Sequence, residues 1–121
     1  MLFWVVVERD PQWQLVRVEF SGGSFWLRDL GHAIGDRVRL QVHARDVSLA
    51  LEQNQQSSIL NILPVSVGEM AADEAGGVTL IRLHIADTVL LASLTLRSVN
   101  HLKLQPGRQV WAQIKSVALI E

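Results

Sequence analysis

Apolar and polar side chains alternate along most of this chain. The alternation is clearest in residues 16–20, 38–43 and 81–85, where every second residue is apolar. A period of two places the apolar side chains on one face of a β-strand. Turn-forming pairs and clusters separate these segments: Asp10-Pro11, Ser21-Gly22-Gly23-Ser24, Gly31 to Gly35, Gly76-Gly77, Ala86-Asp87 and Pro106-Gly107. Many short strands at this spacing predict an all-β sandwich or barrel.

One segment has a helical period instead. In TLRSVNHLKL, residues 95–104, Leu96, Val99 and Leu102 recur at helical spacing. Thr95 stands where an N-cap belongs, and a Pro-Gly pair ends the segment. A barrel of about five strands with one short helix is the pattern of the OB fold.

A weak internal repeat relates residues 35–51 to residues 107–120. The two copies share glycine and apolar positions once two extra residues in the first copy are allowed for. We interpret each copy as a strand pair that closes a small barrel. The sequence therefore predicts two small OB-fold-like β-barrels in tandem, residues 1–54 and 55–121, with the helix in the second. The Glu-Gln-Asn-Gln-Gln stretch joins them.

Composition narrows the class of protein. The 121 residues are 49% hydrophobic and have a net charge of −1, and basic residues alternate with acidic ones, as in Arg9-Asp10, Arg28-Asp29, Asp36-Arg37 and Arg45-Asp46. A nucleic-acid binder usually has a basic stripe, which this chain lacks. The absence of cysteine excludes a disulfide framework and fits a reducing compartment. The opening MLFWVVVERD is too short to span a membrane and lacks the basic start of a signal peptide.

Signatures of catalysis are absent. The sequence has neither a phosphate-binding G-x-x-x-x-G-K-[ST] loop nor a G-x-S-x-G elbow. The four histidines do not have H-x-x-H or H-E-x-x-H spacing, so no metal site is indicated.

Three short segments are more informative: residues 57–61, 94–98 and 113–116. Together they hold hydroxyls, an amide and one lysine, without a carboxylate. Many neutral donors with little fixed charge suit a small tetrahedral oxyanion, which is held by hydrogen bonds and can still leave. Serines in a loop, however, need no ligand to explain them.

The helix start and the last strand each leave more than one interpretation open. Thr95 and Ser98 face a helix N-terminus, whose free N–H groups suit an anion, but Thr95 can also simply cap the helix. Both faces of residues 110–120 are largely apolar, so Lys115 must snorkel to water, find a carboxylate or meet a bound anion.

The three segments, read as SSILN, LTLRS and QIKSVALI with their spacing, resemble the Mop domain, an OB-fold module that binds molybdate or tungstate. Mop domains occur in the molbindins, in a molybdate-responsive regulator and in the ATP-binding subunit of the molybdate ABC importer. The first half of the chain, which includes HARDVSLAL, is similar to the TOBE segment of that importer subunit.

The resemblance implies an oxyanion site shared between two protomers. One protomer would supply Ser58 and Asn61. The other would supply Thr95, Ser98, Lys115 and Ser116, with Arg97 as a further candidate. Many Mop sequences place arginine where this chain has Leu60, so a charged bidentate donor is missing here. A domain that keeps the interface and has lost the anion is therefore also open.

The function implied by the resemblance is that of a regulatory and dimerisation domain in a molybdate importer's ATP-binding subunit. Its ligand would be molybdate or tungstate, without a cofactor, a catalytic residue or a bare metal ion. The ATPase domain that would contact the membrane subunits is not in this sequence, so we expect an excised C-terminal domain or a stand-alone relative. The implied location is cytoplasmic, at the inner face of the cell membrane, with neither membrane insertion nor nucleic acid as a partner.

Other functions remain as alternatives. The first is a structural dimerisation module that binds nothing, and a second is a molbindin-like storage protein. An OB-fold binder of single-stranded nucleic acid ranks behind these, because the chain's aromatic residues are not joined by a basic groove. An enzyme ranks last.

Overall fold

The computed structural model describes residues 3–54, 56–73 and 76–120. Within them the elements follow one another as β1 (Phe3–Asp10), β2 (Leu15–Phe20), β3 (Gly23–Arg28), β4 (Arg37–Gln41), η1 (Ala44–Asp46), β5 (Val47–Ala50), β6 (Asn61–Ala72), β7 (Val78–Ile85), β8 (Thr88–Thr95), α1 (Leu96–His101), β9 (Gln109–Ile114) and β10 (Ala118–Ile120). The expected all-β architecture with one short α-helix is confirmed.

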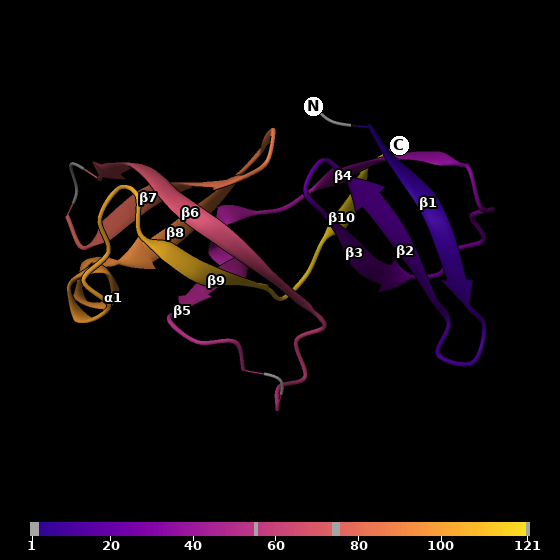
Figure 1. Cartoon of the computed structure of the whole chain (residues 1–121), viewed down its shortest axis with the longest axis horizontal. Coiled ribbons are helices and arrows are strands. Elements are labelled where there is room, and N and C mark those ends of the chain that lie inside the picture. The colour runs from indigo at the N-terminus through magenta and orange to yellow at the C-terminus, as the bar shows by residue number, and fades with distance from the viewer. Residues whose placement is uncertain (1–2, 55, 74–75, 121) are drawn as a thin grey trace.

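The strands form two five-stranded sheets. Their orders are β10-β4-β1-β2-β3 and β5-β9-β6-β7-β8, with every neighbouring pair antiparallel. Each sheet is strongly curled, and the two lie side by side along the long axis (Figure 1). We call them the first and the second barrel. α1 lies between β8 and β9 along the chain.

Each barrel takes its last strand from the other half of the chain. β5 pairs with β9 in the second barrel, and β10 pairs with β4 in the first. The expectation that each copy of the repeat is a strand pair is therefore wrong: β4 and β5 belong to different sheets, as do β9 and β10. Residues 115–117 form no turn, so the chain runs on into the neighbouring barrel.

Because of the exchanged strands, the expected boundary between residues 54 and 55 divides the chain into halves and not into sheets. That boundary lies in the connection between two halves of the chain, and it does not separate the two sheets. Gln55, with which the second unit was expected to begin, lies outside the described residues. The crossing connections lie against each other, because the Lys115 amide donates to the Asp46 carbonyl oxygen at 2.9 Å.

Buried side chains form one core that runs through both barrels. In the first barrel its centre is an aromatic cluster of Trp4, Phe20 and Phe25, whose ring centroids lie 4.6–5.0 Å apart. In the second barrel the centre is aliphatic and includes Ile81 and Leu83, both fully buried. The alternation of apolar and polar residues in the sequence places these side chains in the core, since β7 buries every second residue.

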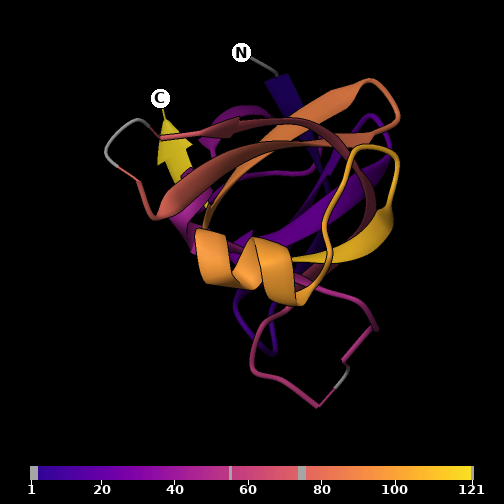
Figure 2. The ribbon, with the colours of Figure 1, turned by 90° about the vertical axis from the view of Figure 1, so that its left-hand side faces the viewer.

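The helix is shorter than the sequence predicts. α1 has six residues and ends at His101, while the pattern extended to residue 104. Lys103 has a positive φ of 52°, the left-handed conformation that commonly ends a helix. The chain then returns to the core, where Leu104 is buried. α1 lies across the outer end of the second barrel (Figure 2). No helix in the described ranges has the length and apolar character needed to cross a membrane.

Candidate functional site

Thr95 and Ser98 form a pair at the start of α1. The Thr95 hydroxyl accepts from the Ser98 amide at 3.1 Å and donates to the Ser98 hydroxyl oxygen at 2.9 Å. The prediction that Thr95 caps the helix is confirmed. Because Ser98 Oγ is the acceptor in this pair, its own proton is available for another group.

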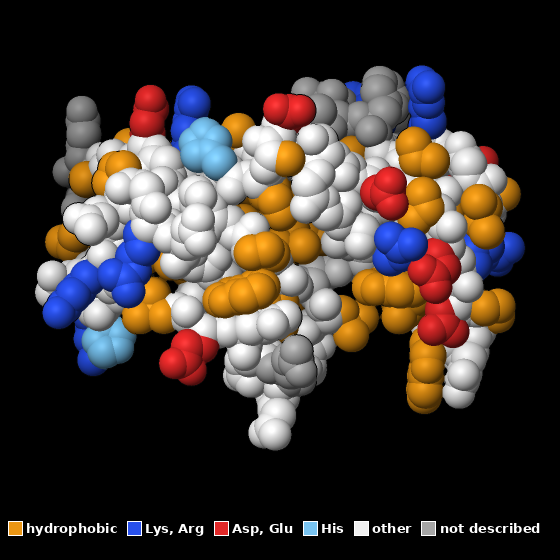
Figure 3. All heavy atoms as spheres, in the orientation of Figure 1, with side chains coloured by type: hydrophobic (Ala, Val, Ile, Leu, Met, Phe, Trp, Pro, Cys, Tyr) orange, Lys and Arg blue, Asp and Glu red, His pale blue; other side chains and the backbone are white. Residues whose placement is uncertain are grey.

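A groove lies between α1 and β5, with a volume of about 360 Å³. We call it the α1 groove. Its walls hold two groups that can be cationic, two hydroxyls and three leucines: Arg97, His101, Ser48, Ser98, Leu49, Leu94 and Leu102. Arg97 and His101 are four residues apart and so project from the same side of the helix. Figure 3 shows basic side chains gathered at this end of the molecule. The groove walls can therefore hold a small anion.

Two groove residues escaped the sequence analysis. His101 could have been found from its spacing to Arg97. Ser48 could not, because it reaches the groove only through the strand exchange. There it donates to the Gln113 side-chain oxygen at 3.0 Å, across the β5–β9 pair.

Asn61 lies away from the groove and already has partners. It is 8% exposed, and its side chain pairs with the main chain of Trp26 in β3. Oδ1 accepts from the Trp26 amide at 2.8 Å, and Nδ2 donates to the Trp26 carbonyl at 3.0 Å. The amide thus imitates a strand neighbour and joins β6 to the first barrel. This bonding favours a structural role.

Lys115 and Ser116 lie where the chain crosses between barrels. The Ser116 hydroxyl donates to the Asp46 carboxylate at 3.1 Å, and the Lys115 side chain is exposed to solvent. Asp46 was outside the three polar segments, so the structure places a carboxylate where the sequence suggested none. A carboxylate repels an oxyanion, and Lys115 is the cation that can offset it.

Ser58 is exposed in the connection that leads to β6, which projects from the molecule in Figure 1. The neighbouring Ser57 hydroxyl accepts from the Ile59 amide at 3.1 Å, which fixes a local turn. Leu60 is 59% exposed, so it is not part of the buried core.

The predicted residues therefore form separate groups. Arg97 and Ser98 line the α1 groove, Thr95 is hydrogen-bonded to Ser98, and Lys115 and Ser116 lie at the crossing. Within the described part of the chain, hydrogen bonds link residues inside each group and do not link the groups. One copy of the chain does not assemble all six residues into a single site.

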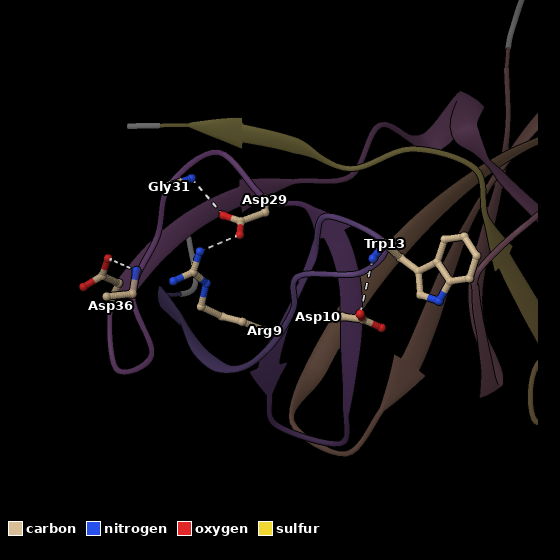
Figure 4. A network of polar contacts seen from close by, with 7 residues as sticks. Arg9, Asp10, Trp13, Asp29, Gly31 and Asp36 are labelled. Atoms are coloured by element: carbon tan, nitrogen blue, oxygen red, sulfur yellow. Dashed lines mark hydrogen bonds and ion pairs between the residues drawn. The ribbon is translucent and has the colours of Figure 1, made fainter.

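The outer end of the first barrel has a different polar network (Figure 4). Arg9 donates to the Asp29 carboxylate at 2.9 Å, and the Gly31 amide donates to the other oxygen at 2.8 Å. The Arg9 hydrogen bond lowers the pKa of Asp29 below its ordinary value of 3.8, and the Gly31 amide lowers it further. Asp36 accepts from the Ala33 amide at 2.9 Å. These contacts fix the course of residues 29–36.

Among the residues that the structure describes, no cluster of three or more histidine or acidic side chains could hold a metal ion.

Comparison with known proteins identifies relatives over nearly the whole chain. The family model described as "TOBE domain" matches residues 57–120, the half to which the sequence analysis had given the Mop label. The molybdenum import ATP-binding protein ModC of Methylococcus capsulatus is 44% identical over 117 residues, which are 97% of this chain and 33% of that protein. ModC of Thiobacillus denitrificans is 48% identical over 116 residues, 96% of this chain and 32% of that protein. The chain thus spans about a third of the length of these relatives.

A solved structure has the same fold. It is that of the cytoplasmic molybdate-binding protein ModG, in a crystal form with molybdate bound. The two superpose with a TM-score of 0.78 at 23% sequence identity, over 97% of this chain and 91% of the other. The likeness extends through both barrels, so the exchanged arrangement belongs to a known architecture.

Proposed function

Because the chain belongs to the TOBE domain family, we propose that it is an oxyanion-binding and dimer-forming domain of a molybdate importer's ATP-binding subunit. The ligand would be molybdate or tungstate. The observation that carries the proposal is the division of the predicted residues into two groups, each exposed and each incomplete. A second copy of the chain could bring Ser58 of one protomer to the α1 groove and the Lys115 group of the other.

The outer face of the second barrel supports association with a second copy. Exposed apolar side chains gather on β7, β8 and the start of α1: Val78, Leu80, Val89, Leu91 and Leu96. In the β7–β8 register each of these strand residues lies opposite a polar or charged one, as with Arg82 opposite Leu91 and His84 opposite Val89, so the apolar side chains alternate with polar groups across the face. A face that exposes several large apolar side chains among polar ones is a candidate surface for association with a second copy.

Binding across two copies would let the anion regulate the importer. A ligand shifts an equilibrium only if it binds one arrangement better than another. An anion held by both protomers binds only when they are together. It would therefore favour the state of the transporter in which the two domains meet. The whole subunit would contact the membrane subunits through its ATPase domain and would lie at the cytoplasmic face of the membrane.

Calorimetry tests the ligand. We expect molybdate to release or absorb heat on titration into the chain, and sulfate to give a weaker response. Ser98→Ala and Lys115→Ala should each weaken binding about tenfold, because each removes a donor to a charged group. Lys103→Ala is the matched control, since Lys103 is the only other lysine and lies outside both groups. Heat equal to that of buffer would remove the ligand from the proposal.

Leu60, Asn61 and Ser116 favour a second candidate function, a dimerisation module without a ligand. Leu60 has no charge to offer, and the side chains of Asn61 and Ser116 already have partners within the chain. Sedimentation separates the two candidates. A dimer that molybdate does not change, together with an equally dimeric Lys115→Ala variant, would select the module without a ligand.

A further inference from the structure

The outer ends of the two barrels are closed in different ways. In the second barrel α1 lies over the end, and Val99 of the helix and Leu102, which directly follows it, pack against the core. In the first barrel residues 29–36 occupy the same place in the strand order, between β3 and β4, without forming a helix. Leu30 and Ile34 in this connection are 59% and 64% exposed, so they do not plug the barrel as the helix does.

The unplugged end opens into an apolar pocket of about 240 Å³. We call it the end pocket. All five strands of the barrel or their immediate extensions line it, chiefly with valine and leucine side chains: Val6, Val16, Val18, Leu27, Val38, Val117 and Leu119. A cavity of about 150 Å³ lined by such residues is large enough to hold benzene. The end pocket therefore has room for a ring or a short hydrocarbon chain.

Arg28 and His32 are the polar members of the pocket lining. Arg28 is exposed, and no partner for its guanidinium occurs among the described residues. The neighbouring Asp29 does not neutralise it, because that carboxylate already accepts from Arg9 and from the Gly31 amide (Figure 4). The pocket is therefore apolar inside and basic at its rim.

These properties define the ligand. A bare inorganic anion is excluded, because the valine and leucine walls offer no donors to replace its hydration. A neutral hydrocarbon would leave the two rim groups unused. We propose that the end pocket binds a small amphipathic carboxylate, with its apolar body among the barrel side chains and its carboxylate at Arg28 and His32. This site is independent of the α1 groove and of the proposed oxyanion.

Methyl NMR with hexanoate as the probe tests the site. We expect saturable shifts of the methyl resonances of Val6, Val16 and Val38. Val117→Phe fills the pocket and should abolish these shifts. Arg28→Gln keeps the pocket and should weaken hexanoate about tenfold, because it removes a charge-assisted hydrogen bond. Arg97→Gln is the matched control at the other end of the molecule and should leave hexanoate binding unchanged.

Three outcomes would overturn the proposal. The first is an absence of methyl shifts at millimolar hexanoate in the wild-type chain. The second is shifts confined to residues around α1. The third is hexanol binding as tightly as hexanoate, which would remove the carboxylate from the ligand's description. Circular dichroism of Val117→Phe checks that it is folded, and Arg28→Gln tests the same site without altering the core.

Discussion

The two barrels have the same strand order and the same exchanged last strand, and they differ at their outer ends. The second has an amphipathic helix that fills its end with Val99 and Leu102 and places Ser98 and Arg97 on the surface. The first has a connection without a helix, over a pocket that is lined mainly by valine and leucine side chains. The same five-stranded framework thus offers polar donors at one end of the molecule and an apolar pocket at the other.

The largest expected effect is on the free energy of unfolding, and it tests whether the two barrels unfold independently. Phe25 is fully buried, and its ring lies 4.9 Å from that of Trp4 and 5.0 Å from that of Phe20. We expect Phe25→Ala to lower the free energy of unfolding by about 3–5 kcal/mol. Because each sheet contains a strand from the other half, urea should unfold both barrels in one transition.

The controls for this prediction lie in both barrels. Ile81→Ala, in the core of the second barrel, should cost about 2–5 kcal/mol and also leave a single transition. Trp13→Ala, at a residue that is 68% exposed, should change stability by no more than about 0.5 kcal/mol. Two separate transitions in Phe25→Ala would contradict the coupling of the barrels through the exchanged strands.

The local features of both barrels could be predicted from the sequence, and the strand exchange that joins the barrels could not. The alternation of apolar residues predicts the strands, and the position of Thr95 predicts the helix cap. Both features depend on residues that are close together in the chain. The exchange depends on residues 115–117 running straight where a turn would have returned the chain. Two barrels with internal hairpins would bury the same apolar faces, so the hydrophobic pattern does not distinguish them.

The candidate site shows the same limit. Arg97 and Ser98 could be placed on one groove from the helix alone, but Ser48 and Asp46 arrive from the other half of the chain. The amide of Asn61 was equally suited to a ligand or to a neighbouring strand. Only the position of β3 shows that Trp26 is its partner.

The next prediction concerns the polar bond between barrels. Asn61→Ala leaves the Trp26 amide and carbonyl without their partners in a partly buried place. We expect a loss of about 2 kcal/mol in unfolding free energy, since two hydrogen bonds to the main chain are removed. Asn100→Ala, at an exposed residue of α1, is the matched control and should have little effect. Equal stabilities of the two variants would show that the Asn61 bonds contribute nothing.

The helix that distinguishes the second barrel gives a smaller effect. Thr95→Ala removes the cap and should cost about 1 kcal/mol. Ser98→Ala keeps the cap, because Thr95 accepts from the main-chain amide of Ser98. Its stability should therefore stay near that of the wild type while its affinity for molybdate falls. A comparison of thermal unfolding with calorimetry separates the two roles, and equal destabilisation by both variants would contradict the assignment.

The smallest effect is expected at the network that holds residues 29–36. The folded pKa of Asp29 lies below 3.8, so its ionised form stabilises the fold above that pH, and the contribution is lost as the pH falls through the folded pKa. Arg9→Gln removes the main cause of the lowered pKa. The variant should therefore lose less stability than the wild type on acidification from well above pH 3.8 to below it. Urea unfolding at several pH values measures this, with Arg82→Gln on β7 as the control. If the unfolding free energies of wild type and Arg9→Gln fall equally on acidification, the Arg9–Asp29 contact does not hold the rim of the end pocket in place.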